Sequence, residues 1–309
     1  MNQAPDVLWL SVSPHLKCFD QRLLSKLVKA GPIRRWEYLQ TIDEPCCIEA
    51  VVEALHEHIS DRIALENSSS DNNASDNSTL GNSTSQQKST HRAHKLHLLG
   101  HGVSGIVGLM YARRYPQHVA SLTLLSVNAL PAVNWQAHYY ALRQLLPCSR
   151  NMILAQMTRL LFGEQPVRFA RALSKLLARD LDSNLTLHSL AHHTHIAPDT
   201  LEVPLLVCNG ELDGIARAPQ PTAEAAATTT TSTSTNTCEN TQWETWLKPE
   251  DRLWLCPGGN HFFHFNHYTV VANRIMDYWQ QVALHPTTSQ QVIRDTSGNN
   301  VSSDLLFTR

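Results

Sequence analysis

The 309-residue chain lacks several features that would assign it to a specialised class of protein. Charged residues make up only 17% of it and nearly cancel, giving a formal net charge of -2. The whole-chain balance therefore gives no electrostatic reason to expect nucleic acid or an anionic membrane as a partner. The sequence has no run of about 18 apolar residues, and no basic segment followed by an apolar stretch at its start. We therefore expect a cytoplasmic protein without integral membrane association.

Cysteine is also scarce, at seven residues scattered along the chain, and an odd number leaves one unpaired. This argues against a disulfide framework and fits a reducing compartment. Histidine is abundant instead, and it is clustered at 192–195 ("HHTH") and at His261, His264 and His267. Neither cluster has the carboxylate or cysteine ligands of a recognisable zinc motif, so we expect no metal ion and no other cofactor.

Three segments have too few apolar side chains to build a core. Residues 67–90 and 217–241 consist almost entirely of small and polar residues, and residues 285–309 are also polar. Such segments cannot bury enough apolar surface to offset the entropy lost on ordering. The sequence therefore predicts two low-complexity surface insertions and a polar tail.

The remaining sequence alternates between two patterns. Apolar runs of strand length and composition occupy 6–12, 33–39, 95–100, 121–127, 203–209 and 251–257. Helical stretches lie between most of these runs and near the end of the chain, which predicts an α/β protein with a doubly wound, mostly parallel sheet. Residues 133–202 have several helical stretches and no convincing strand. They predict a helical cap over the carboxyl edge of the strands, on a core formed by 1–132 and 203–284.

Three motifs lie on this framework in a fixed order. They are "LHLLGHGVSGIVGLMYARRYP" (96–116), "VPLLVCNGELDG" (203–214) and "CPGGNHFFHF" (256–265). The first is a strand, a tight glycine turn and a helix. Together the motifs resemble the nucleophile elbow, the acid segment and the base segment of the α/β-hydrolase superfamily, in its capped esterase or lipase-like branch. The resemblance implies that Asp213 is the triad acid and His261 the general base.

The nucleophile departs from the family pattern. The elbow is "GHGVSG" (100–105), so Gly102 stands where the family has serine. Ser104 lies two residues further on, turned by about 200° around the helix, and its hydroxyl should point away from His261. Glycine adopts the positive φ of such a turn with little strain. Gly102 therefore indicates that covalent catalysis has been lost and the turn kept.

Two backbone positions remain candidates for binding an anion. The first amides of the helix after the turn, beginning at Val103, form the positive end of a helix. The family's second oxyanion donor comes from the loop after the first strand, here 11–16 with Ser13. That loop lacks the family's usual His-Gly pair.

Three functions remain open, so the sequence does not decide whether the chain is an enzyme. The first is a pseudoenzyme that binds a ligand or a protein partner, for which the N-myc downstream regulated proteins of the same superfamily are a precedent. The second is a hydrolase of ester-type substrates, or another enzyme, in which Asp213 and His261 activate water or deprotonate the substrate. The third is a conventional esterase using Ser104. The cap is rich in Leu, Met, Tyr and Phe, which favours a small apolar or amphipathic ligand or substrate.

Overall fold

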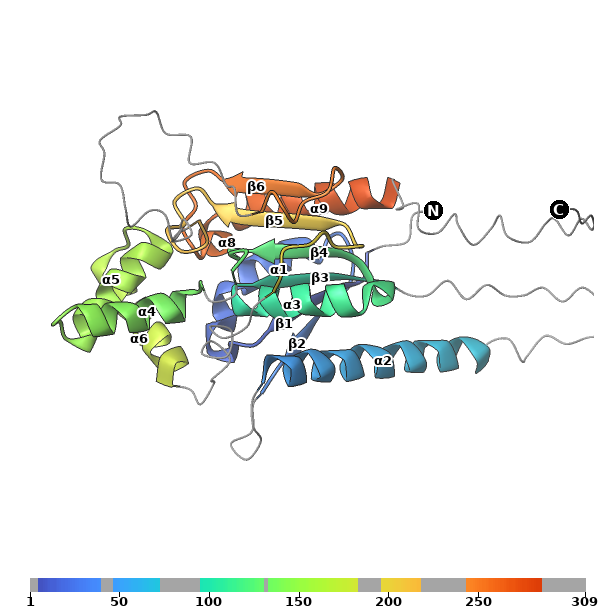
Figure 1. Ribbon diagram of the computed structural model, residues 1–309, viewed down its shortest axis with the longest axis horizontal. Coiled ribbons are helices and arrows are strands. Elements are labelled where there is room, and N and C mark those ends of the chain that lie inside the picture. The colour runs from blue at the N-terminus through green and yellow to red at the C-terminus, as the bar shows by residue number, and fades with distance from the viewer. Residues whose placement is uncertain are drawn as a thin grey trace, which may run out of the picture.

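A computed structural model describes residues 5–39, 47–72, 95–130, 133–182, 196–217 and 243–284. The histidine cluster at 192–195, most of both predicted insertions and the predicted tail lie outside the described residues. The strands are β1 (Val7–Ser11), β2 (Ile33–Glu37), β3 (Leu96–His101), β4 (Val119–Leu125), β5 (Leu205–Gly210) and β6 (Arg252–Cys256) (Figure 1). The helices are η1 (Pro14–Phe19), α1 (Gln21–Leu27), α2 (Ile48–Asn72), α3 (Val103–Arg114), η2 (Pro116–His118), α4 (Trp135–Leu145), α5 (Arg150–Phe162), α6 (Val167–Asp182), α8 (Phe263–Asn266) and α9 (Tyr268–Leu284).

The six strands form one sheet in the order β2-β1-β3-β4-β5-β6, and every neighbouring pair is parallel. Each strand lies at one of the predicted apolar runs, so the predicted fold class is confirmed. The strand order reverses between β1 and β3, because β2 lies on one side of β1 and the later strands lie on the other. In open α/β sheets, ligands bind at the carboxyl ends of the strands at such a reversal.

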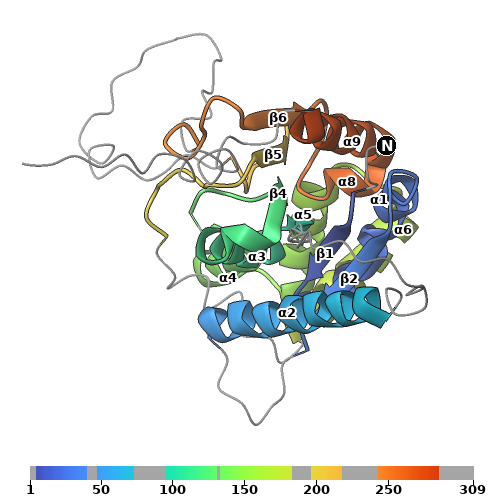
Figure 2. The same ribbon diagram turned by 90° about the vertical axis from the view of Figure 1, so that its right-hand side faces the viewer.

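Helices cover both faces of the sheet. Helices α2 and α3 lie on one face, and α1 and α9 lie on the other (Figure 2). Neighbouring strand residues point to opposite faces, as Leu98 and Leu99 illustrate: Leu98 packs in the α2 and α3 core, and Leu99 packs in the core with α9. Both side chains are fully buried, which explains why the strands are apolar runs rather than alternating patterns.

Helix α2 is longer than its apolar pattern predicts. The pattern indicates a helix over 47–59, whereas α2 continues to Asn72 and includes the first residues of the predicted insertion 67–90. No glycine or proline occurs between Ile48 and Asn72, so no residue of the backbone-breaking types ends the helix earlier.

Three cap helices, α4, α5 and α6, lie beyond the carboxyl edge of the sheet (Figure 1). Two of them begin at side-chain caps: Asn134 Oδ1 accepts a hydrogen bond from the Ala137 amide at 2.9 Å, and Ser149 Oγ accepts one from the Met152 amide at 3.3 Å. Their apolar faces form a third core with Phe19 and Phe262 from the edge of the sheet. The residue ranges predicted for the core (1–132 and 203–284) and for the cap (133–202) remain predictions. Among the described helices, none is long and apolar enough to cross a membrane.

Candidate functional site

The turn between β3 and α3 has the backbone conformation that the glycine pattern predicts. Gly102 has φ 53° and ψ -126°. Residues other than glycine adopt this backbone conformation only under strain. A Cβ atom added at Gly102 would meet no atom within 4 Å, so a side chain at this position would enter open space. The turn requires glycine at position 100 for a different reason. A Cβ atom added there would lie 2.6 Å from the Gly105 amide nitrogen, because the helix passes close to the strand at this point.

The structure brings Asp213 and His261 into contact. His261 Nδ1 lies 3.0 Å from Asp213 Oδ2 and 3.2 Å from Oδ1. Asp213 Oδ1 also accepts hydrogen bonds from the amides of Ile215 and Ala216, each at 2.9 Å. Burial by itself raises the pKa of Asp213, but the electrostatic interaction and hydrogen bond with His261 and the two amides together lower that pKa below its ordinary value. Asp213 is therefore an ionised acceptor of the hydrogen bond from His261 Nδ1, and the second ring nitrogen of His261 is Nε2.

That second nitrogen is an unsatisfied group of the site, as is Gln136 Oε1. His261 is 2% exposed, and its Nε2 is a buried atom without a hydrogen-bond partner among the described residues. Leaving a buried acceptor unpaired costs about 1 to 3 kcal/mol. His261 and Gly102 both line one pocket.

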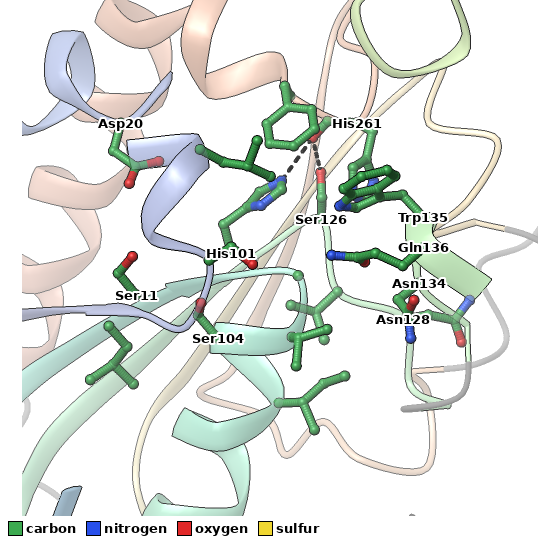
Figure 3. A pocket seen from close by; sticks show the side chains of 18 of the residues that line it. Ser11, Asp20, His101, Ser104, Ser126, Asn128, Asn134, Trp135, Gln136 and His261 are labelled. Carbon is green, nitrogen blue, oxygen red and sulfur yellow. Dashed lines mark hydrogen bonds between the residues drawn. The ribbon is translucent and has the colours of Figure 1, made fainter. Parts of the chain in front are cut away.

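The Ser104 hydroxyl makes a hydrogen bond to the loop after β1. Its side chain is 6% exposed, and its Oγ accepts a hydrogen bond from the Val12 amide at 3.0 Å. In Figure 3 Ser104 lies beside Ser11, on the opposite side of the view from His261. This agrees with the direction expected from the helix geometry. The hydroxyl ties α3 to the loop after β1 and is not placed for attack on a substrate at His261.

Replacing Ser104 with alanine is therefore expected to lower the stability of the fold. The variant leaves the buried Val12 amide without its acceptor, which should reduce the free energy of unfolding by about 1 to 3 kcal/mol. Urea unfolding followed by circular dichroism measures the change. Ser25→Ala is the matched control, since Ser25 Oγ makes an exposed bond to the Arg22 carbonyl, and it should change stability by less than about 0.5 kcal/mol. Equal losses in the two variants would contradict this role for Ser104.

Two residues that the sequence did not single out position His261. Ser126 Oγ and His101 Nε2 both donate hydrogen bonds to the His261 carbonyl oxygen, the latter at 3.2 Å (Figure 3). Ser126 is 2% exposed and has φ 50°, and it is the one non-glycine residue with positive φ among the described residues. Burial, and then the neighbouring His264 and His261, hold the pKa of His101 well below its ordinary value, so His101 is a neutral donor. His261 is thus fixed through both its ring and its backbone.

The remaining histidines of the 261–267 cluster are not arranged around a metal. His264 is fully buried and its Nε2 lies 3.3 Å from Asp20 Oδ1, while Trp9 Nε1 donates to Asp20 Oδ2 at 3.0 Å. Within the described ranges, no group of three metal-ligating side chains has a geometry that could hold an ion.

The pocket itself is small and has a mixed lining. Its volume is about 40 Å³, which is room for about three water molecules. The polar side chains that line it are Ser11, Ser13, Asp20, His101, Ser104, Ser126, Asn128, Asn134, Gln136 and His261. Figure 3 shows Ser11, Ser104 and Asp20 on one side of this pocket, with Asn128, Asn134, Gln136 and Trp135 on the other. Val103 and Ser13, the two candidate anion-binding positions, also line it, at the carboxyl ends of the two strands where the order reverses.

Known proteins resemble this chain at two levels. An uncharacterized protein of Synechocystis sp. (strain ATCC 27184 / PCC 6803 / Kazusa), sll0249, is 34% identical over 283 residues, covering 91% of this chain and 93% of the relative. Another uncharacterized protein, alr2406 of Nostoc sp. (strain PCC 7120 / SAG 25.82 / UTEX 2576), is 33% identical over 293 residues, covering 95% and 98%. No family model matches the chain.

Solved structures share the fold at much lower identity. A thermophilic esterase from Thermogutta terrifontis superimposes with a TM-score of 0.54 at 17% identity, covering 92% of both chains. A membrane phospholipase A superimposes with a TM-score of 0.59 at 13% identity, covering 91% of this chain and 80% of the other. The chain therefore has the fold of the α/β-hydrolases, and it belongs to the family of sll0249 and alr2406.

Proposed function

We propose that this protein is a member of the superfamily without serine catalysis, and that it binds a small amphipathic ligand beneath the cap. A hydrogen-bond donor of the ligand pairs with His261 Nε2. The observation that carries the proposal is the buried, unpartnered Nε2 of His261, a residue that lines the same pocket as Gly102. Because that nitrogen costs free energy when unpaired, a donor that reaches it is stabilised.

The size and lining of the pocket support a ligand with a small polar head. A volume of about 40 Å³ accommodates a hydroxyl or carboxylic acid group and not a long chain. The polar side chains give such a group several partners, whereas Leu16, Val133 and Trp135 line the side toward the cap and suit an apolar remainder. This pattern favours an amphipathic ligand over a purely apolar one.

The absence of a placed nucleophile supports binding without a covalent intermediate. Gly102 has no side chain, and the Ser104 hydroxyl is held by the Val12 amide. Serine hydrolases need the nucleophile within hydrogen-bond distance of the general base, a contact that neither residue makes with His261 in the described chain.

A second function is favoured by the intact pair of Asp213 and His261. A water molecule in the space at Gly102 could donate its proton to Nε2 and attack an ester carbonyl directly. Removing one member of a proteolytic triad leaves a rate only about 10³ to 10⁴ above that of water, so such a hydrolase would be slow.

Binding is tested with 1-butanol, whose hydroxyl is a donor, and is followed by tryptophan fluorescence, since Trp9 and Trp135 line the pocket. The wild-type chain should show a saturable change, and His261→Ala should weaken binding about tenfold because one hydrogen bond is lost. His267→Ala is the matched control, since His267 does not line the pocket, and it should bind as the wild type does. Equal affinity in His261→Ala would overturn the proposal.

Turnover of p-nitrophenyl butyrate separates the two functions. If the protein only binds, the wild-type chain hydrolyses the ester no faster than His261→Ala does. If water is activated, turnover disappears in His261→Ala and persists in Ser104→Ala.

A further inference from the structure

The cap carries a positive charge that the chain as a whole does not have. Residues 133–182 contain seven Lys and Arg against three Asp and Glu, whereas the whole chain has 25 against 27. Two of the three cap carboxylates are already paired: Asp182 with Arg150 at 2.6 Å, and Glu164 with Arg159 at 2.8 Å. The third, on α6, is buried inside the cap. The unbalanced charge is therefore concentrated on the outer face of α6.

Four cations of α6 form a single row, here called the α6 basic stripe: Arg168, Arg171, Lys175 and Arg179. All four are exposed. Their spacing of three, four and four residues places them within about 80° of the helix circumference. The buried leucines of α6 lie on the opposite face and pack into the cap core. The helix is thus fixed with the stripe directed to solvent.

The stripe has no anionic partner within the part of the chain that the structure describes. The ion pairs of the cap involve Arg150 and Arg159 of α5 and none of the four stripe residues. Like charges three and four residues apart on a helix destabilise it by a few tenths of a kcal/mol per pair. An anionic surface that covers this row offsets the repulsion between its positive charges.

The side chains around the stripe favour a lipid surface over a nucleic acid. Val167 and Phe169, at the start of α6, are 68% and 39% exposed. On the other two cap helices, Leu145 is 76% exposed and Met152 is 62% exposed. Exposed apolar side chains on the same helix as a basic face match the interfacial region of a membrane, where apolar groups enter the acyl boundary and cations meet the headgroups.

We propose that the α6 basic stripe, with the exposed apolar side chains of the cap, docks the protein on a surface of anionic phospholipid. The contact is peripheral and involves the cap alone. It does not depend on the function proposed for His261, because no stripe residue lines the pocket.

Vesicle co-sedimentation of the full chain tests the proposal. The wild type should sediment with vesicles of phosphatidylcholine containing a third phosphatidylserine and not with phosphatidylcholine alone, and salt should weaken the binding. The variant Arg171→Gln/Lys175→Gln should bind the anionic vesicles about thirtyfold more weakly, because each cation near such a surface contributes about a fivefold affinity. Glutamine is a good helix former, so the fold should be kept, and circular dichroism checks this.

The matched control is Lys29→Gln/Lys95→Gln, which removes the same charge from two exposed lysines near the amino ends of β2 and β3, away from the cap. It should bind anionic vesicles as the wild type does. The proposal is overturned if the wild type ignores the phosphatidylserine content, or if the two double variants lose affinity equally. It is also overturned if duplex DNA at the same phosphate concentration displaces the wild type from the vesicles, since the stripe would then be a nucleic-acid surface.

Discussion

Replacing Gly102 with serine is expected to create an ester hydrolase that depends on His261. The Gly102→Ser variant should hydrolyse p-nitrophenyl butyrate about 10² to 10³ times faster than the wild-type chain. A serine side chain at this position enters open space in the same pocket as the unpaired Nε2 of His261. We expect less than the full effect of a triad, because the loop that includes Ser13 lacks the family's usual oxyanion sequence and its Val12 amide is bonded to Ser104.

The gain in rate should be accompanied by a loss of stability. Gly102 has φ 53°, and a residue with a Cβ at such an angle costs about 1 to 3 kcal/mol. Gly102→Ala is the matched control, since it introduces the same backbone strain without a hydroxyl. Both variants should unfold at lower urea concentration, and only Gly102→Ser should be active. Adding His261→Ala to Gly102→Ser should remove the activity. A folded Gly102→Ser protein without activity would show that His261 is not aimed at the elbow.

Most of the fold could be predicted because its signals are local. Each strand is an apolar run of the right length between turn residues, and buried parallel strands need no other pattern. The elbow could be predicted because its three glycines are required by local geometry. Gly100 and Gly105 allow the close approach of helix and strand, and Gly102 has a positive φ. The full length of α2 could not be predicted, because its apolar pattern ends before the helix does.

The candidate site could be predicted only in part, because its remaining contacts join distant parts of the chain. The hydrogen bonds from His101 and Ser126 to the His261 carbonyl span 160 and 135 residues, and no local pattern marks either donor. Pocket volume depends on how the cap packs against the sheet, which residue types do not specify. The α6 basic stripe does not appear in the net charge of the whole chain, because acidic residues elsewhere cancel it.

Replacing Asp180 with asparagine is expected to stabilise the protein at alkaline pH. Asp180 lies on α6, is 5% exposed, and accepts a hydrogen bond from Gln136 Nε2 of α4 at 3.3 Å. Burial raises the pKa of Asp180 to about 7, against the lowering effect of the Gln136 bond. The native state thus keeps this proton up to about pH 7, whereas the unfolded chain loses it near pH 3.8.

The sign of the pH dependence follows from the number of protons bound. Between the two pKa values the native state binds more protons than the unfolded state, so raising the pH lowers the free energy of unfolding. The loss is about 1.4 kcal/mol per pH unit, and about 4 kcal/mol at most by pH 8. Asparagine resembles the protonated acid in shape and has no charge to desolvate. Asp180→Asn should therefore exceed the stability of the wild type by about 1.6 kcal/mol at pH 5 and by about 4 kcal/mol at pH 8.5.

Urea unfolding of both proteins at the two pH values measures this difference. Asp182→Asn is the matched control: its carboxylate is 59% exposed and paired with Arg150 at 2.6 Å on the surface. An exposed pair contributes at most about 1 kcal/mol, so this variant should lose a little stability and lose it equally at pH 5 and pH 8.5. Equal stabilisation by Asp180→Asn at both pH values would mean that Asp180 does not titrate between them. A stabilisation that is larger at pH 8.5 than at pH 5 would instead show that burying this carboxyl beneath the cap makes the charged form costly.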